Sequence, residues 1–157
     1  MGIQNIYVLR SDGTLIFSKD YHSIKEDAVV VSGFLSAIDT FAKSIGAGKQ
    51  VQKIITDEFQ FVGKSSKKYG IKYVVICDKD DSTEQVESLL TSMNKSFLIK
   101  YNKLLNSKNP YVDMDQFKDW SKNLDKLIEK SDLSSFSTVV SKTMKDLKNI
   151  FKKIEDL

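Results

Sequence analysis

Residues 3–21 read IQNIYVLRSDGTLIFSKDY, two runs rich in β-branched and aromatic residues on either side of Ser11, Asp12 and Gly13. β-Branched and aromatic residues favour strands, and a short turn that contains Asp-Gly between two such runs is typical of a hairpin. The sequence therefore predicts two antiparallel strands, at 3–10 and 14–21.

A helix is predicted after this hairpin, at residues 27–45, where apolar side chains recur at i, i+3 and i+4 until Gly46. The side chains that this spacing predicts to be buried are those of Val31, Phe34, Leu35, Ile38, Phe41, Ala42 and Ile45. Three strand-like runs follow, at 51–57, from Phe59 onward, and at 71–77. The order of the first ninety residues is therefore ββαβββ.

Helical periodicity returns after the fifth strand, at 82–105 and at 115–129. Ser82 and Gln85 match a capping box, which predicts that the first of these helices begins at this point. A last amphipathic helix is predicted from Leu133 to the C-terminus. We divide the chain into a domain at 1–130 and a C-terminal amphipathic helix at 131–157, which packs on the domain or on a partner.

The strands differ in a way that predicts their order in the sheet. Residues 6–9 and 73–77 carry apolar side chains at both alternating sets of positions, which is typical of strands buried on both faces. We expect these two strands to be adjacent and central, with the second strand beyond the first, and the fourth and third beyond the fifth. The fold class is α/β (α+β), a five-stranded, mainly antiparallel sheet of order ββαβββαα. One helix covers one face, and two helices cover the other.

Composition excludes several classes of function. The chain has 157 residues and a net charge of +3 from 24 basic and 21 acidic residues, and Arg10 is its only arginine. Scarce arginine and nearly balanced charge argue against a nucleic-acid binder. Cys77 is the only cysteine and lies in an apolar run, which predicts a buried thiol and a reducing compartment. No signal peptide or long apolar segment is recognisable, so we expect a cytoplasmic protein.

No motif predicts catalysis, a cofactor or a metal. Asp78, Asp80 and Asp81 form an acidic turn, but the glycine and glutamate of an EF-hand loop are missing at the required spacing. Gly46–Lys49 resembles a phosphate loop only superficially, because it leads from a helix into a strand. His22 is the only histidine and has no nucleophile in a recognisable motif beside it. We therefore expect a binding module rather than an enzyme.

The C-terminal helix is open to two interpretations. Its apolar face can pack on the chain's own domain, which the sequence favours, or it can serve a partner helix or an anionic membrane surface. The plausible contact surfaces are the open sheet edges and the exposed flank of the helix at 27–45, and we expect a dimer at the edge of the second strand or along that helix. The individual residues predicted to contact a partner come from the second strand and from the C-terminal helix. They are Leu15, Phe17, Val140, Met144, Leu147, Phe151 and Ile154.

The pattern of Asn5–Leu9 before Ser11-Asp12-Gly13, of residues 33–41, and of Tyr73–Ile76 before an acidic turn resembles the longin fold. This module occurs in longin-type SNAREs, adaptor small subunits and the small subunits of TRAPP tethering complexes, and the resemblance covers residues 1–130. The related roadblock fold begins with a helix, whereas this chain begins with a strand.

The resemblance implies a non-catalytic scaffold in a small-GTPase-linked or membrane-trafficking-like complex. Its implied partners are a small GTPase and another longin or roadblock protein in a homo- or heterodimer, with membrane contact at most peripheral. One alternative is a small-molecule sensor with a cavity lined by Phe59, Phe61, Tyr69 and Tyr73. The other alternative is a structural subunit of a coat- or tether-like assembly.

Overall fold

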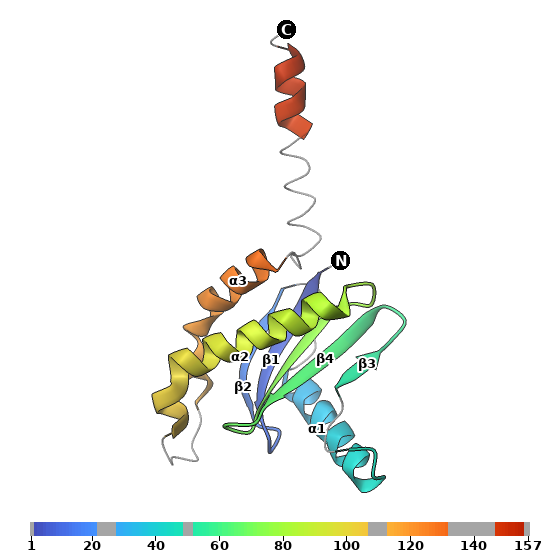
Figure 1. Cartoon of the computed structure of the whole chain (residues 1–157), viewed down its shortest axis with the longest axis vertical. Helices are drawn as coiled ribbons and strands as arrows, with labels where there is room; N and C mark the ends of the chain where they lie inside the picture. The colour runs from blue at the N-terminus through green and yellow to red at the C-terminus, as the bar shows by residue number, and fades with distance from the viewer. Residues whose placement is uncertain (1, 22–27, 49–51, 107–112, 132–146, 156–157) are drawn as a thin grey trace.

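The computed structural model describes residues 2–21, 28–48, 52–106, 113–131 and 147–155 (Figure 1). A five-stranded sheet has the order β2-β1-β5-β4-β3, and every neighbouring pair is antiparallel. Its strands are β1 (Ile3–Arg10), β2 (Leu15–Asp20), β3 (Lys53–Ile55), β4 (Phe59–Ser66) and β5 (Ile71–Asp78). The predicted order of the strands is confirmed.

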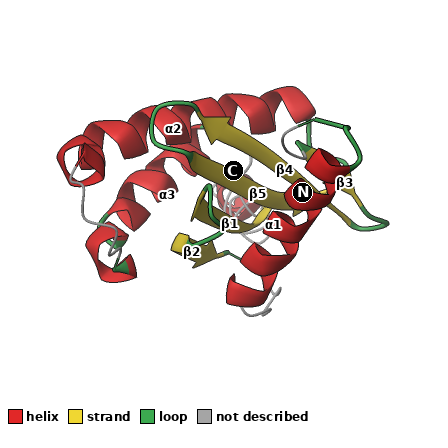
Figure 2. Cartoon of the chain, turned by 90° about the horizontal axis from the view of Figure 1, so that it is seen from below, coloured by secondary structure: helices red, strands yellow, loops and turns green. Residues whose placement is uncertain are grey.

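The helices lie on both faces of this sheet (Figure 2). They are α1 (Ala28–Ser44), α2 (Thr83–Asn106), the short 3-10 helix η1 (Met114–Phe117) and α3 (Trp120–Lys130). A further helix spans residues 147–155. α2 and α3 cover one face and α1 covers the other, as the sequence predicts.

Two predicted boundaries need correction. The third strand is shorter than the predicted 51–57, because the Thr56 N–H donates to the Phe59 carbonyl, and the Phe59 N–H donates to Thr56 Oγ1. These bonds turn the chain toward β4. The helix predicted at 115–129 begins as η1 after Asp113, whose side chain accepts from the Asp115 N–H, and α3 starts only at Trp120.

The larger of the two cores lies between the sheet and the α2–α3 layer. Alternate side chains of the central strands, among them Ile6 and Val75, point into it and are fully buried. Phe97 of α2 lies at the centre of an aromatic cluster, with ring centroids 5.4 Å from Phe117 and 5.0 Å from Trp120. These aromatic contacts pack α2, η1 and α3 together into one layer.

The core under α1 is smaller. α1 contributes Leu35 to this core, where it packs among side chains of the three strands below: Tyr7, Leu9, Leu15, Val74 and Ile76. Asp39 adds an ion pair of 2.6 Å to Lys72 of β5. The hairpin turn also touches α1 closely, because a Cβ on Gly13 would lie 2.5 Å from Ser36 Oγ. α1 is therefore held along one side only.

Candidate interaction surface

The outer side of α1 carries large apolar side chains that the sheet does not cover. Val30, Phe34, Phe41 and Ile45 are each between 50% and 63% exposed. Their spacing of four, seven and four residues places them on one side of the helix. We call these four residues the α1 flank.

The α1 flank is also uncharged. The charged residues of α1 are Asp39 and Lys43, and Asp39 points inward to Lys72. Small residues, Gly33 and Ala37, lie between the large apolar side chains and leave them accessible. Contiguous apolar surface without charge is rare on the exterior of a monomer and is typical of the centre of a protein–protein interface.

This surface corrects the sequence analysis, which predicted that Phe34, Phe41 and Ile45 would be buried. Ser32, Leu35 and Ala42 are the side chains of α1 that are buried instead. A sheet buries only one stripe along a helix that packs on it. The apolar residues of α1 extend over a wider arc than that stripe. The breadth of the apolar arc is the sequence signal that points to a second contact surface.

β3 provides an open edge on the same side of the molecule. It is the last strand of the sheet and pairs with β4 alone among the strands that the structure describes. Ile55 at its end is exposed, and Ile54 lies beside α1 residues Leu35 and Ile38. An edge strand presents N–H and C=O groups that a second chain can complete. β3 and the α1 flank are therefore the best candidates for a shared docking surface.

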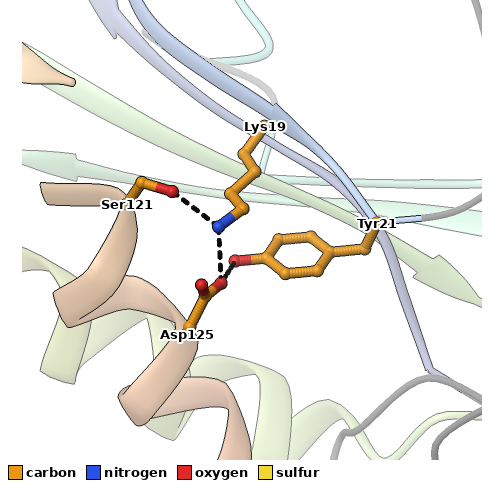
Figure 3. A network of polar contacts seen from close by, with 4 residues as sticks. All are labelled: Lys19, Tyr21, Ser121 and Asp125. Carbon is orange, nitrogen blue, oxygen red and sulfur yellow. Dashed lines mark hydrogen bonds and ion pairs between the residues drawn. The ribbon is translucent and has the colours of Figure 1, made fainter. Parts of the chain in front are cut away.

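At the opposite end of the sheet, side chains on and just after β2 make polar contacts to α3 (Figure 3). Lys19 Nζ donates to Asp125 Oδ1 at 2.6 Å and to Ser121 Oγ, and the Tyr21 hydroxyl donates to the same carboxylate oxygen at 2.7 Å. Burial and the neighbouring Asp125 carboxylate raise the pKa of Tyr21. Burial raises the pKa of Asp125, but the hydrogen bonds from Lys19 and Tyr21 outweigh it and lower that pKa.

This network fastens α3 to the sheet rather than forming a reactive centre. A serine next to a lysine can act as a nucleophile only when the lysine is neutral and accepts the serine proton. Here Lys19 Nζ donates to Ser121 Oγ and forms an ion pair of 2.6 Å with the Asp125 carboxylate. The contacts therefore join β2 to α3.

The partner contacts predicted from the sequence fall in different environments. Leu15 and Phe17 are buried, and the Phe17 ring packs edge-on against Trp120 at 5.0 Å. A partner at this strand would meet backbone rather than these side chains. Leu147, Phe151 and Ile154 are exposed on the helix at 147–155. Val140 and Met144 lie outside the described residues.

The cavity predicted for a small-molecule sensor does not form. Phe59 and Phe61 pack on the α1 side of the sheet, whereas Tyr69 and Tyr73 pack on the α2 side. The space beside Phe61 under α1 has a volume of about 10 Å³, which is room for one water molecule. These four side chains therefore do not surround a shared ligand cavity.

The acidic turn after β5 serves the fold. The Asp81 carboxylate accepts from the Gly2 and Asp78 N–H groups, each at 3.1 Å. Within the described part of the chain, no group of three His, Cys, Asp or Glu side chains could hold a metal ion. Burial, and secondarily the charge of Asp81, raises the pKa of the Cys77 thiol to about 12. No described helix is long and apolar enough to cross a membrane.

Solved structures share this architecture at low sequence identity. The mammalian signal recognition particle (SRP) receptor matches with a TM-score of 0.53 and 12% identity over 83% of this chain and 95% of that chain. The SRb-GTP/SRX complex of the SRP receptor from Chaetomium thermophilum matches with a TM-score of 0.52 and 15% identity, over 81% of this chain and 98% of that chain. A roadblock/LC7 domain from Streptomyces avermitilis matches with a TM-score of 0.51 and 13% identity, over 66% of this chain and 88% of that chain.

The chain has the longin-like fold. The ββαβββ order, with α1 on one face of the sheet and α2 and α3 on the other, agrees with the resemblance that the sequence suggested. No protein-family model matches the sequence, and a search of curated proteins gives no match. The likeness to solved structures concerns the fold.

Proposed function

We propose that this longin-like chain is a non-catalytic interaction module that pairs, through the α1 flank and the β3 edge, with a second longin-type subunit. The second subunit is another copy or a related chain, and the pair binds a small GTP-binding protein. The observation that carries the proposal is the uncharged, exposed apolar flank of α1 beside an open sheet edge.

The size of the flank is suited to a specific contact. Covering four apolar side chains that are at least half exposed contributes on the order of 4–6 kcal/mol before the entropy of association is subtracted. Backbone hydrogen bonds along β3 would fix the register of the two chains. In a symmetric pair each chain supplies the same flank, so the contribution is doubled.

The GTP-binding partner is proposed from one of the solved structures that share this fold. One of the matching structures is a complex that contains SRb with GTP and SRX. The α1 flank and the β3 edge carry no reactive groups, which fits a role as a scaffold for such a partner. The alternative of a coat-like structural subunit uses the same flank but predicts no dependence on a nucleotide.

Association is tested with Phe34→Glu and Phe41→Glu, each measured by light scattering over a range of protein concentrations. Thr40→Glu is the matched control, because it adds the same charge to an exposed position of α1 outside the flank. We expect the wild-type chain and the control to associate and the flank variants to remain monomeric. Equal association of all four proteins would contradict the assigned surface.

The GTP-binding partner is tested separately by capture from lysate with the immobilised wild-type chain. Captured small GTP-binding proteins are then purified and loaded with GDP or with a non-hydrolysable GTP analogue. We expect binding that differs between the two nucleotide states and that Phe41→Glu abolishes. Binding by a captured protein that ignores the nucleotide would favour the structural-subunit alternative.

A further inference from the structure

The helix at residues 147–155 has an apolar face that no other described part of the chain covers. It reads LKNIFKKIE and is drawn in red at the top of Figure 1. All nine of its residues are exposed, and its large apolar side chains, those of Leu147, Ile150, Phe151 and Ile154, are between 44% and 62% exposed. This face is therefore available to a partner or a surface.

Charge is distributed around the helix in a distinct pattern. At about 100° per residue, the four apolar side chains fall within an arc of about 100°. Lys148, Lys152 and Lys153 occupy the rest of the circumference, and Glu155 is the acidic residue among the nine. The helix is thus apolar on one side and basic on the other.

We infer that residues 147–155 bind the surface of an anionic lipid bilayer, with the helix axis in the plane of the membrane. The apolar arc enters the boundary between headgroups and acyl chains, as in other interfacial helices. The three lysines stay at headgroup level, because their long stems let the ammonium groups reach anionic phosphates. The apolar arc supplies insertion into the bilayer, and the lysines supply the preference for anionic lipid.

Two other occupants fit the helix less well. The α1 flank could pack against the apolar arc, but it offers no charge to the lysines. A second copy of the helix would form a two-stranded seam, which needs a narrow apolar stripe. Ile150 and Phe151 are adjacent, so the apolar arc is wider than such a stripe, and a flat bilayer accommodates that width.

The full chain is tested by cosedimentation with vesicles of phosphatidylcholine alone and of phosphatidylcholine with phosphatidylserine. We expect binding to the anionic vesicles that weakens as the salt concentration rises, and little binding to the neutral vesicles. Replacing Lys148, Lys152 and Lys153 with Gln should weaken binding about fivefold per lysine, or about a hundredfold in total. Equal binding to both kinds of vesicle would overturn the inference.

Matched variants distinguish binding through this helix from a general effect of the chain's net charge. Lys67→Gln, Lys95→Gln and Lys103→Gln together remove the same charge from exposed positions of the domain and should leave binding nearly unchanged. Phe151→Glu should lower binding more than tenfold beyond Asn149→Glu, which adds the same charge to the polar side. Equal losses in the two lysine triples, or in the two glutamate variants, would contradict the proposed site.

The outcome is independent of the proposed function. Phe34→Glu should keep full binding to anionic vesicles even where it abolishes association of the domain. If the helix variants instead lower the molecular mass measured by light scattering and leave sedimentation with vesicles unchanged, the occupant is a second chain and the lipid inference is wrong.

Discussion

Val75 shows at the scale of a residue why the central strands tolerate little change. It is fully buried in the larger core and lies opposite Ile6 of β1. We predict that Val75→Asp lowers the free energy of unfolding by at least about 3 kcal/mol, because a carboxylate would be buried without a partner. Denaturant unfolding or loss of soluble expression measures this. An unchanged midpoint would contradict the assignment of β5 to the centre.

Cys77 gives a second prediction at this scale. Burial, and the charge of Asp81, raises the pKa of its thiol to about 12, so the thiol is protonated at neutral pH. Only the thiolate reacts rapidly with alkylating reagents. We predict that iodoacetamide leaves the native chain unmodified at pH 8 and modifies it fully in denaturant. Rapid labelling of the native chain, followed by mass spectrometry, would show that the thiol is accessible.

Asp125 should make stability depend on pH. Its pKa in the folded chain lies below the ordinary value of 3.8, so its contacts with Lys19 and Tyr21 stabilise the fold above that value. This stabilisation is lost as the pH falls through the folded pKa. The carboxylate is 44% exposed, so the effect should be below about 1 kcal/mol.

Denaturant unfolding at pH 6 and pH 3 measures this effect. We predict that Asp125→Asn lowers stability at pH 6 but has little effect at pH 3. Asp119→Asn, at an exposed position nearby, is the control and should change stability equally at both values. A loss for Asp125→Asn that is the same at the two pH values would show that the carboxylate charge is not the cause.

At the scale of elements, the contact between the first hairpin and α1 can be tested by a double substitution. Gly13 has φ of +90°, and a Cβ there would lie 2.5 Å from Ser36 Oγ. We predict that Gly13→Ala lowers the free energy of unfolding by about 1–3 kcal/mol. Adding Ser36→Ala should restore part of this loss, because it removes the clash but not the backbone strain. Denaturant unfolding measures both variants. If the losses of unfolding free energy from the two substitutions simply add, a clash between the new Cβ and Ser36 Oγ is excluded as the cause.

The elements also show what a sequence can predict. The hairpin, the central strands and the helix α2 follow from local patterns, since period two or period 3.6 decides them. A contact surface along this helix was expected, but the exposed residues that form the α1 flank did not follow, because periodicity finds an apolar arc but not how much of it a sheet will cover. The polar contacts of Lys19 with Asp125 join positions more than a hundred residues apart, and no local pattern in the sequence reports them.

At the scale of the whole molecule, the domain and the C-terminal helix should be separable. The sequence favoured packing of this helix on the domain, but all residues at 147–155 are exposed. We now predict that deleting residues 147–157 changes the melting temperature by less than about 2 °C, because the described residues of this segment, 147–155, are all exposed and contribute little buried apolar area. Circular dichroism melting of both chains measures this. A large drop would show that the helix packs on the domain.

The unequal cores have a consequence for how the molecule opens. α1 is attached through Leu35, the Asp39–Lys72 ion pair and the hairpin contact, whereas α2 shares an extended aromatic cluster. Regions with few buried contacts open locally at lower free energy than the rest of a fold. Backbone amides of α1 should therefore exchange with deuterium well before those of α2. A subunit bound to the flank would slow that exchange, and deuterium uptake would then identify the bound surface without any substitution.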